Sequence, residues 1–86
     1  MQIIIDPHTL QRASERGASE NEIKDVLQTG TPSFAKGGRK SKSKVYDFNK
    51  EWSGKHYEQK KIEVIFTEQG DSIITVTVYV FYGKWN

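Results

Sequence analysis

The residues best suited to move protons beside a phosphate group form a short series near the start of the chain. The series is His8, Arg12, Glu15 and Arg16. Steps of three or four positions relate them, so a helix would bring them near one side. A histidine can transfer a proton near neutral pH, and guanidinium groups bind phosphate oxygens. The same spacing also suits an ordinary surface ion-pair stripe, and both interpretations stay open.

A second candidate group lies later in the chain. His56 stands between Lys55 and Tyr57, which suits a general acid or base with a phosphate clamp beside it. It could equally be a solvent-exposed histidine. Tyr79 and Lys84 belong to an aromatic and basic cluster near the C-terminal end, where each aromatic residue could also pack in the core.

These groups fit RNA cleavage better than metal-dependent chemistry. Two histidines, no cysteine and no paired-histidine spacing predict no metal site. The chain also has no phosphate-binding glycine motif, so we expect no cofactor. RNA supplies its own nucleophile, the 2′-hydroxyl, and the protein needs only a base, an acid and cations around the phosphate. Metal-free phosphodiester cleavage is therefore the enzymatic reaction that these residues suit best.

Positive charge is concentrated in one segment. Residues 36–61 contain nine basic and three acidic residues, whereas the rest of the chain contains four basic and eight acidic residues. Such a concentration is typical of proteins that bind nucleic acid, although a solvated lysine-rich loop would look the same. The candidate RNA-binding residues are Lys36, Arg39, Lys40, Lys42, Lys44, Lys55 and Lys84.

Two helices are predicted, and the first of them carries this series. Asp6-Pro7 favours the start of a helix that Gly17 would end. Ser19 and Glu22 form a capping box for a second helix, which Gly30 would end. Each helix has about ten residues, and the link between them is short. We therefore expect a tight helical hairpin.

Strands are predicted on both sides of these helices. Gln2–Ile5 is a short apolar run, and residues 36–44 have the composition of a flexible basic loop. Val45–Asn49 resumes as a strand, and Lys61–Glu68 with Ser72–Tyr82 forms a hairpin around a glycine turn. The predicted fold class is α+β: a short first strand, a helical hairpin and a three-stranded antiparallel sheet.

The last strand has two different rows of side chains, because side chains alternate along a strand. The aliphatic row, expected under the helices, is Ile74, Val76, Val78 and Val80. The row expected to face outward is Ile73, Thr75, Thr77, Tyr79 and Phe81. An open sheet face with hydroxyls and aromatic rings beside a basic loop is a plausible RNA surface.

Length and composition predict a single domain over residues 1–86. The absence of cysteine, of a secretory signal and of a long apolar run favours a soluble cytoplasmic protein with no membrane association. The core of so short a chain is thin, which leaves a homo-oligomer or a second chain as open alternatives.

The stretch from His8 to Gly30 resembles the opening of a family called domain of unknown function 4258. Its members begin with a histidine, continue through a turn like Glu15-Arg16-Gly17, and end a second helix at glycine. Residues 74–79 resemble the closing strand of the family. The resemblance covers nearly the whole chain except the basic stretch at 36–44.

That family looks related to the RelE-like toxins, including the BrnT type. The resemblance implies a RelE-like fold, a ribonuclease that acts on RNA or at the ribosome, and a cognate antitoxin. It also marks His8, Arg12, Arg16 and Tyr79 as matches to recurring family residues, whereas His56 has no family counterpart.

Taken together, residues and resemblance predict a metal-independent endoribonuclease toxin. His8 or His56 would be the acid and base, and the cations Arg12, Arg16 and Lys84 would stabilise charge. The alternative is a non-catalytic RNA- or protein-binding module on the same fold. A third interpretation is an accessory subunit that pairs with another chain through the edge of the hairpin.

Overall fold

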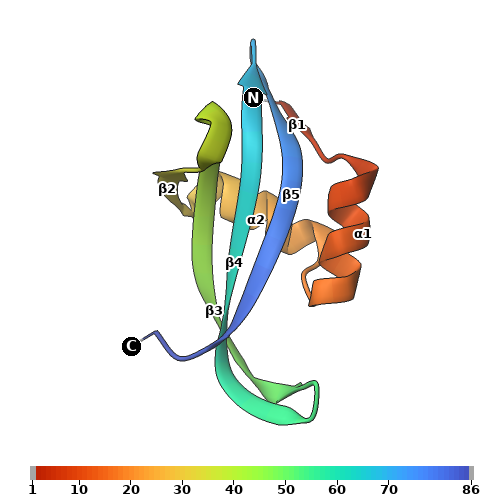
Figure 1. Ribbon diagram of the computed structural model, residues 1–86, viewed down its shortest axis with the longest axis vertical. Coiled ribbons are helices and arrows are strands. Elements are labelled where there is room, and N and C mark those ends of the chain that lie inside the picture. Colours follow the sequence, from red (N-terminus) through yellow and green to blue (C-terminus); the bar gives the residue numbers. More distant parts are fainter. Residues whose placement is uncertain (1, 86) are drawn as a thin grey trace.

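The computed structural model describes residues 2–85 and has two helices on a five-stranded mixed sheet (Figure 1). The elements are β1 (Gln2–Ile4), α1 (Pro7–Arg16), α2 (Glu20–Thr29), β2 (Thr31–Phe34), the 3₁₀ turn η1 (Lys36–Gly38), β3 (Lys40–Trp52), β4 (Lys55–Gln69) and β5 (Ser72–Gly83). The sheet order is β1-β5-β4-β3-β2. Only the β1–β5 pair is parallel. The predicted α+β class is confirmed, but the predicted three-stranded sheet is too small.

Local capping sets both helices, as the sequence predicts. The Asp6 side chain accepts the His8 N–H at 2.8 Å at the start of α1. Gly17 ends that helix with φ +94°, a left-handed conformation that glycine adopts without steric cost. Both hydrogen bonds of the Ser19–Glu22 capping box are present at the start of α2.

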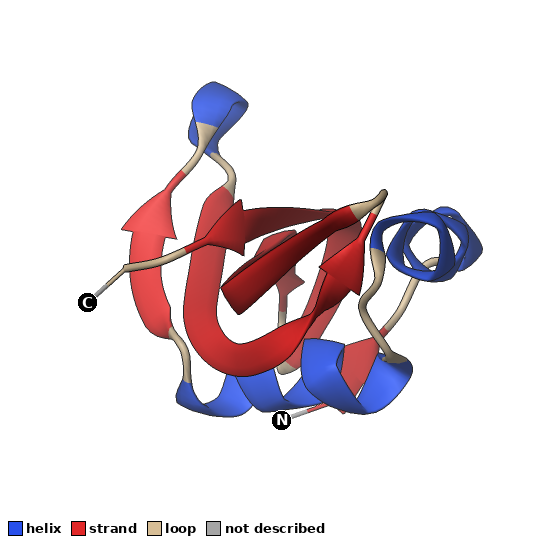
Figure 2. Ribbon diagram, turned by 90° about the horizontal axis from the view of Figure 1, so that it is seen from below, coloured by secondary structure: helices blue, strands red, loops and turns tan. Residues whose placement is uncertain are grey.

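The two helices do not pack as the predicted hairpin. Figures 1 and 2 show α1 alongside β5, whereas α2 crosses behind β3 and β4. Each helix buries its apolar side against the sheet: Ala13 from α1, and Ile23, Val26 and Leu27 from α2. Burial against strands removes more apolar surface from water than contact between two short, largely polar helices.

No helix in residues 2–85 has the length and hydrophobicity needed to cross a membrane.

Strands β3 to β5 form a long antiparallel meander. The predicted glycine turn around Gly70 is present, and a turn at Ser53-Gly54 joins β3 to β4. Strand β4 begins at Lys55, well before its predicted start at Lys61, and β5 ends at Gly83, one residue after its predicted end. Two features of the preceding segment differ from expectation. Strand β2 was not predicted, and β3 begins at Lys40, so the predicted loop over 36–44 is wrong from that residue onward.

Strand β5 contains a β-bulge at Val76. Ile65 pairs with Thr77, whereas the next residue of β4, Phe66, pairs with Thr75. One residue of β5 is therefore left over, and side chains before and after it follow different alternations. The two continuous rows predicted for the last strand do not exist, because the rows exchange faces at the bulge.

The residues before the bulge consequently face the helices. Ile73 and Thr75, predicted to point outward, are each 3% exposed. Thr75 Oγ1 accepts the Asp6 N–H and donates to Thr9 Oγ1, both at 2.9 Å, which ties β5 to the start of α1. After the bulge the prediction is correct, since Val78 is fully buried in the core.

Candidate functional site

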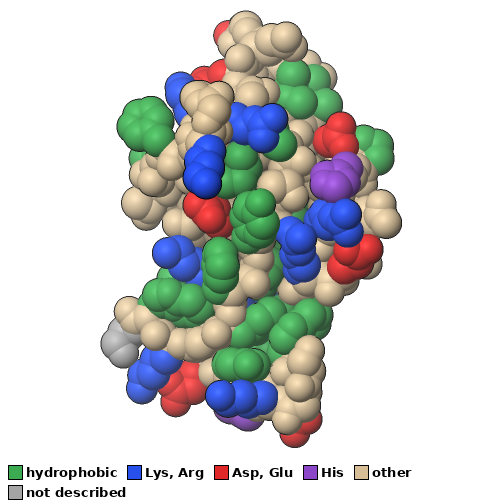
Figure 3. All heavy atoms as spheres, in the orientation of Figure 1, with side chains coloured by type: hydrophobic (Ala, Val, Ile, Leu, Met, Phe, Trp, Pro, Cys, Tyr) green, Lys and Arg blue, Asp and Glu red, His purple; other side chains and the backbone are tan. Residues whose placement is uncertain are grey.

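The face of the sheet opposite α2 carries the aromatic and basic residues of greatest functional interest. Ile62 and Val64 of β4 are buried in the core on the α2 side, so the alternating residues Lys61, Glu63 and Ile65 point the other way. We call this the open face. Figure 3 shows hydrophobic and basic side chains gathered over its middle.

Two aromatic rings stand on the open face. Tyr79 is 42% exposed and Phe81 is 48% exposed, and their ring centroids are 6.4 Å apart. Both follow the bulge in β5, so their positions in the outward row agree with the sequence prediction. Exposed rings at this spacing offer two neighbouring surfaces for flat ligands.

Arg16 reaches this face from the end of α1. Strand β1 pairs only with the first residues of β5, so the later part of that edge lies beside α1. Arg16 Nη1 donates to the Val78 carbonyl at 2.6 Å, and the guanidinium carbon lies 5.2 Å from the centroid of the Tyr79 ring. One hydrogen bond uses only part of the donor capacity of a guanidinium, which has five N–H groups.

The backbone of Arg16 is held as well. The Tyr82 hydroxyl donates to the Arg16 carbonyl at 2.6 Å, and its ring stacks on Trp52 at 4.9 Å between centroids. Burial, and secondarily Glu22, raises the pKa of Tyr82, so the hydroxyl keeps the proton that it donates. A Cβ on Gly17 would lie 2.2 Å from the Tyr82 oxygen, which explains why glycine must follow Arg16.

Two further cations approach Tyr79 from the other side. Lys36 and Arg39 line a cavity of about 250 Å³ together with Ala35, Ile65, Thr77 and Tyr79. Figure 2 shows η1 on the side of the sheet opposite α2. Tyr79 is thus flanked by Arg16 from α1 and by Lys36 and Arg39 from the segment between β2 and β3.

The other cations of the basic stretch lie elsewhere. Alternation along β3 places Lys40, Lys42 and Lys44 on the α2 side of the sheet, where each has a partner. Lys40 pairs with Glu68, Lys42 Nζ donates to the Leu27 carbonyl at 2.8 Å, and Lys44 Nζ lies 2.7 Å from Asp25. Hydrogen bonds from Lys40 and Lys44 lower the pKa values of Glu68 and Asp25 respectively. We call these three residues the tethered lysines.

Two predicted RNA-binding lysines do not line the cavity beside Tyr79. Lys55 follows the β3–β4 turn, with Nζ 5.5 Å from the centroid of the Tyr57 ring. Lys84 lies after β5, and its Nζ is 3.3 Å from Glu58. The structure places neither in the cavity beside Tyr79.

The two histidines are in different parts of the molecule. His8 is an exposed residue in the first turn of α1, on the helix that also carries Arg12 and Arg16. Arg12 pairs with Glu15 at 2.8 Å, and this hydrogen bond lowers the pKa of Glu15. His56 is exposed beside the β3–β4 turn, which lies at the far end of the molecule from β1 (Figure 1). The structure therefore does not bring His8 and His56 together in one site.

Sequence reasoning missed Glu63, the carboxylate nearest to Tyr79 in the sheet register. Glu63 is the cross-strand partner of Tyr79 on one side and of Ser43 on the other. It takes part in no ion pair among residues 2–85. The alternation of Lys61 and Glu63 with buried aliphatic residues was the signal that could have placed it on the open face.

A family model described as Domain of unknown function (DUF4258) matches residues 5–80. The match spans every element that contributes to the open face, from α1 to most of β5. Comparisons with curated proteins and with solved structures give no match.

Proposed function

The chain belongs to the DUF4258 family, and we propose that it is a RelE-like toxin that acts as a metal-independent endoribonuclease. The observation that carries this proposal is the position of Tyr79, with Arg16 on one side and Lys36 and Arg39 on the other. Cations around an exposed aromatic ring suit a phosphodiester with an unstacked base beside it.

The open face favours single-stranded RNA as the substrate. Tyr79 and Phe81 present ring faces that a paired, stacked duplex could not use, whereas splayed bases can stack on them. Lys36 and Arg39 would hold the phosphates on either side of such a base. The cavity of about 250 Å³ beside Tyr79 offers space for a planar ring.

The same residues supply the parts needed for cleavage. Glu63 would accept the proton of the ribose 2′-hydroxyl, whose oxygen attacks the adjacent phosphorus. The bond to the 5′-oxygen then breaks, and the Tyr79 hydroxyl would give that oxygen its proton. Arg16 and Arg39 would stabilise the additional negative charge on the phosphate. The products are a 2′,3′-cyclic phosphate and a 5′-hydroxyl end.

The histidines predicted as acid and base have secondary places in this proposal. His8 shares α1 with Arg16 and could reach RNA that extends along the helix, whereas His56 is at the other end of the sheet. Replacement of both by alanine is therefore expected to weaken binding at most several-fold and to leave cleavage measurable.

The direct test is incubation of the purified chain with a labelled single-stranded RNA in excess chelator. Cleavage to cyclic phosphate ends is expected, and Glu63→Gln and Tyr79→Phe should each lower the rate constant at least about tenfold, as for loss of a general acid or base. Expression should arrest growth, and co-expression of a neighbouring antitoxin gene should restore it. Intact RNA together with normal growth at high expression would refute the toxin proposal.

The alternative is a non-catalytic RNA-binding module, and one observation favours it. The two histidines, which are the side chains best suited to proton transfer at neutral pH, are not brought together. This alternative predicts salt-dependent RNA binding at the open face with no product under any condition. A cytoplasmic location and action at the ribosome are further parts of the toxin proposal.

A further inference from the structure

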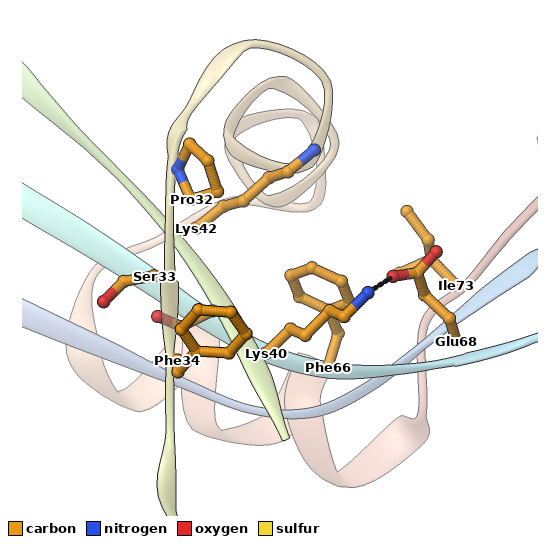
Figure 4. Close-up of a pocket in the computed structure, with 9 residues that line it drawn as sticks. Pro32, Ser33, Phe34, Lys40, Lys42, Phe66, Glu68 and Ile73 are labelled. Carbon is orange, nitrogen blue, oxygen red and sulfur yellow. Dashed lines mark hydrogen bonds and ion pairs between the residues drawn. The ribbon is translucent and has the colours of Figure 1, made fainter. Parts of the chain in front are cut away.

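A second and larger cavity lies on the other side of the molecule, beside the edge strand β2. Its volume is about 410 Å³, and its walls include Pro32, Phe34, Phe66 and Ile73. Figure 4 shows the rings of Phe34 and Phe66 around the hollow, with the Lys40–Glu68 ion pair beside it. Phe34 is 86% exposed, an unusual position for a large aromatic residue.

The main chain of β2 has free hydrogen-bonding groups at this cavity. The Ala35 N–H donates to the Arg39 carbonyl at 2.9 Å. Bonded and non-bonded pairs alternate in an antiparallel ladder, so Phe34 and Pro32 are the non-bonded partners in β3 pairing. They direct their polar groups away from β3, and β2 is the last strand of the sheet. The free groups are the N–H and carbonyl of Phe34 and the carbonyl of Pro32.

Charge defines what could occupy this edge. Residues 31–44 contain five basic residues and no acidic residue. The tethered lysines among them already have partners, but Lys36 and Arg39 take part in no ion pair within residues 2–85. They follow Phe34 by two and five positions, so a chain that runs along β2 would meet them next.

We propose that the β2 edge binds an extended, acidic segment of a partner protein. A residue of that segment would pair with Phe34 through both main-chain groups, and its apolar side chain would enter the cavity beside Phe66. This pairing makes the segment antiparallel to β2, so acidic residues one or two positions before the paired residue would meet Lys36 and Arg39. Strand addition of this kind takes affinity from main-chain hydrogen bonds and specificity from side-chain pockets.

A partner protein explains this edge better than two other occupants. A second copy of the chain would bring another five basic residues to the same place, which like-charge repulsion disfavours. RNA could contact Lys36 and Arg39 but has no aliphatic side chain to fill an apolar cavity. A segment that covers these two cations would also block the side of the open face on which the RNA proposal depends.

The test uses the whole folded chain and a displayed library of random ten-residue peptides. Enriched peptides should contain Asp or Glu shortly before an apolar residue, because the peptide would run antiparallel to β2. A synthetic copy of one should slow hydrogen exchange at the Phe34 amide. Phe34→Ser should weaken its binding at least about tenfold, which corresponds to about 1.4 kcal/mol. Lys36→Glu should weaken it as well.

A matched control separates this inference from the RNA proposal. Phe81→Ser removes an exposed aromatic residue from the open face and should leave peptide affinity within about twofold, whereas Phe34→Ser should leave RNA binding unchanged. No enriched peptide, enriched peptides without acidic residues, or equal binding to Phe34→Ser would each overturn the proposed edge site. Loss of RNA binding in Phe34→Ser would assign the surface to nucleic acid and also overturn it. None of these results depends on whether the chain cleaves RNA.

Discussion

Five basic residues lie between positions 36 and 44, and the start of β3 divides them into two groups. Lys36 and Arg39 precede the strand, and they line the cavity beside Tyr79. The tethered lysines lie within β3, and their side chains reach Glu68, the Leu27 carbonyl and Asp25. Residues of one chemical type and one stretch of sequence therefore face opposite sides of the sheet.

The difference shows that local charge density is a poor guide to a nucleic-acid surface when a strand runs through it. Lys42 and Lys44 stabilise the contact between α2 and the sheet: Lys42 donates to the Leu27 carbonyl near the negative end of the helix, and Lys44 pairs with Asp25. Lys40 pairs with Glu68 of the neighbouring strand β4. Of the five basic residues, Lys36 and Arg39 lie outside the strand and stay available to an anionic ligand. The comparison makes separate predictions for binding and for stability.

The largest effect is expected from removal of the two aromatic rings on the open face. Tyr79→Ala with Phe81→Ala should weaken binding of a single-stranded RNA at least about thirtyfold, since stacking contributes about 1–3 kcal/mol per base. Fluorescence anisotropy with a labelled RNA measures this effect. The matched control is Phe34→Ala, an exposed aromatic residue on another surface. Equal losses in both variants would show that the open face is not the RNA surface.

The next effect concerns the tethered lysines. Lys42→Met should lower the free energy of unfolding by about 1–2 kcal/mol, because it removes a charge-assisted hydrogen bond at the C-terminal end of α2. RNA affinity should be unchanged. Urea denaturation gives the stability, and Lys36→Met is the control, with no loss of stability expected. A variant of Lys42 that binds RNA worse at full stability would contradict the division into two groups.

Sequence reasoning succeeded where the determinants are local. The Asp6 and Ser19 caps and the ends at Gly17 and Gly30 depend on residues within one turn of each other, and both helices have their predicted bounds. Their arrangement is not local. Which surface each helix covers depends on strands that follow much later in the chain, and the predicted helical hairpin was wrong for that reason.

The errors in the strands have a related cause. Lys40-Ser41-Lys42-Ser43-Lys44 has the period of two that is typical of a strand, but lysine and serine favour a loop by composition. The bulge at Val76 is a property of the pairing between β4 and β5, and no residue of β5 alone indicates it. Tyr79 was nevertheless placed correctly, since it follows the bulge. Glu63 was missed because the β-branched and aromatic residues around it indicate a strand but do not show which face of the strand is open.

A third prediction measures the free cations one at a time. Lys36→Met and Arg39→Met should each reduce the slope of log affinity against log salt by about 0.7, the value for one phosphate contact with a single strand. The corresponding change at a tethered lysine, Lys40→Met, should leave the slope as it is. Anisotropy titrations at four salt concentrations distinguish these cases. Equal slopes in all three variants would mean that β3 does not separate two groups of cations.

The smallest effect is the pH dependence of one tether. Hydrogen bonds from Lys44 and then Tyr46 hold the pKa of Asp25 below its ordinary value of 3.8. A carboxyl with a lowered pKa in the folded state stabilises the fold fully above its unfolded pKa, and this contribution is lost as the pH falls through the folded pKa. The stability difference between the wild type and Asp25→Asn should therefore be constant from neutral pH to about pH 5 and shrink below about pH 4.

Urea denaturation between pH 2.5 and 7 measures this difference. The control is Asp47→Asn, because Asp47 takes part in no ion pair within residues 2–85. A difference that grows on acidification would mean that Asp25 is not held by Lys44 in solution, and the tethered group would then contain two lysines in place of three.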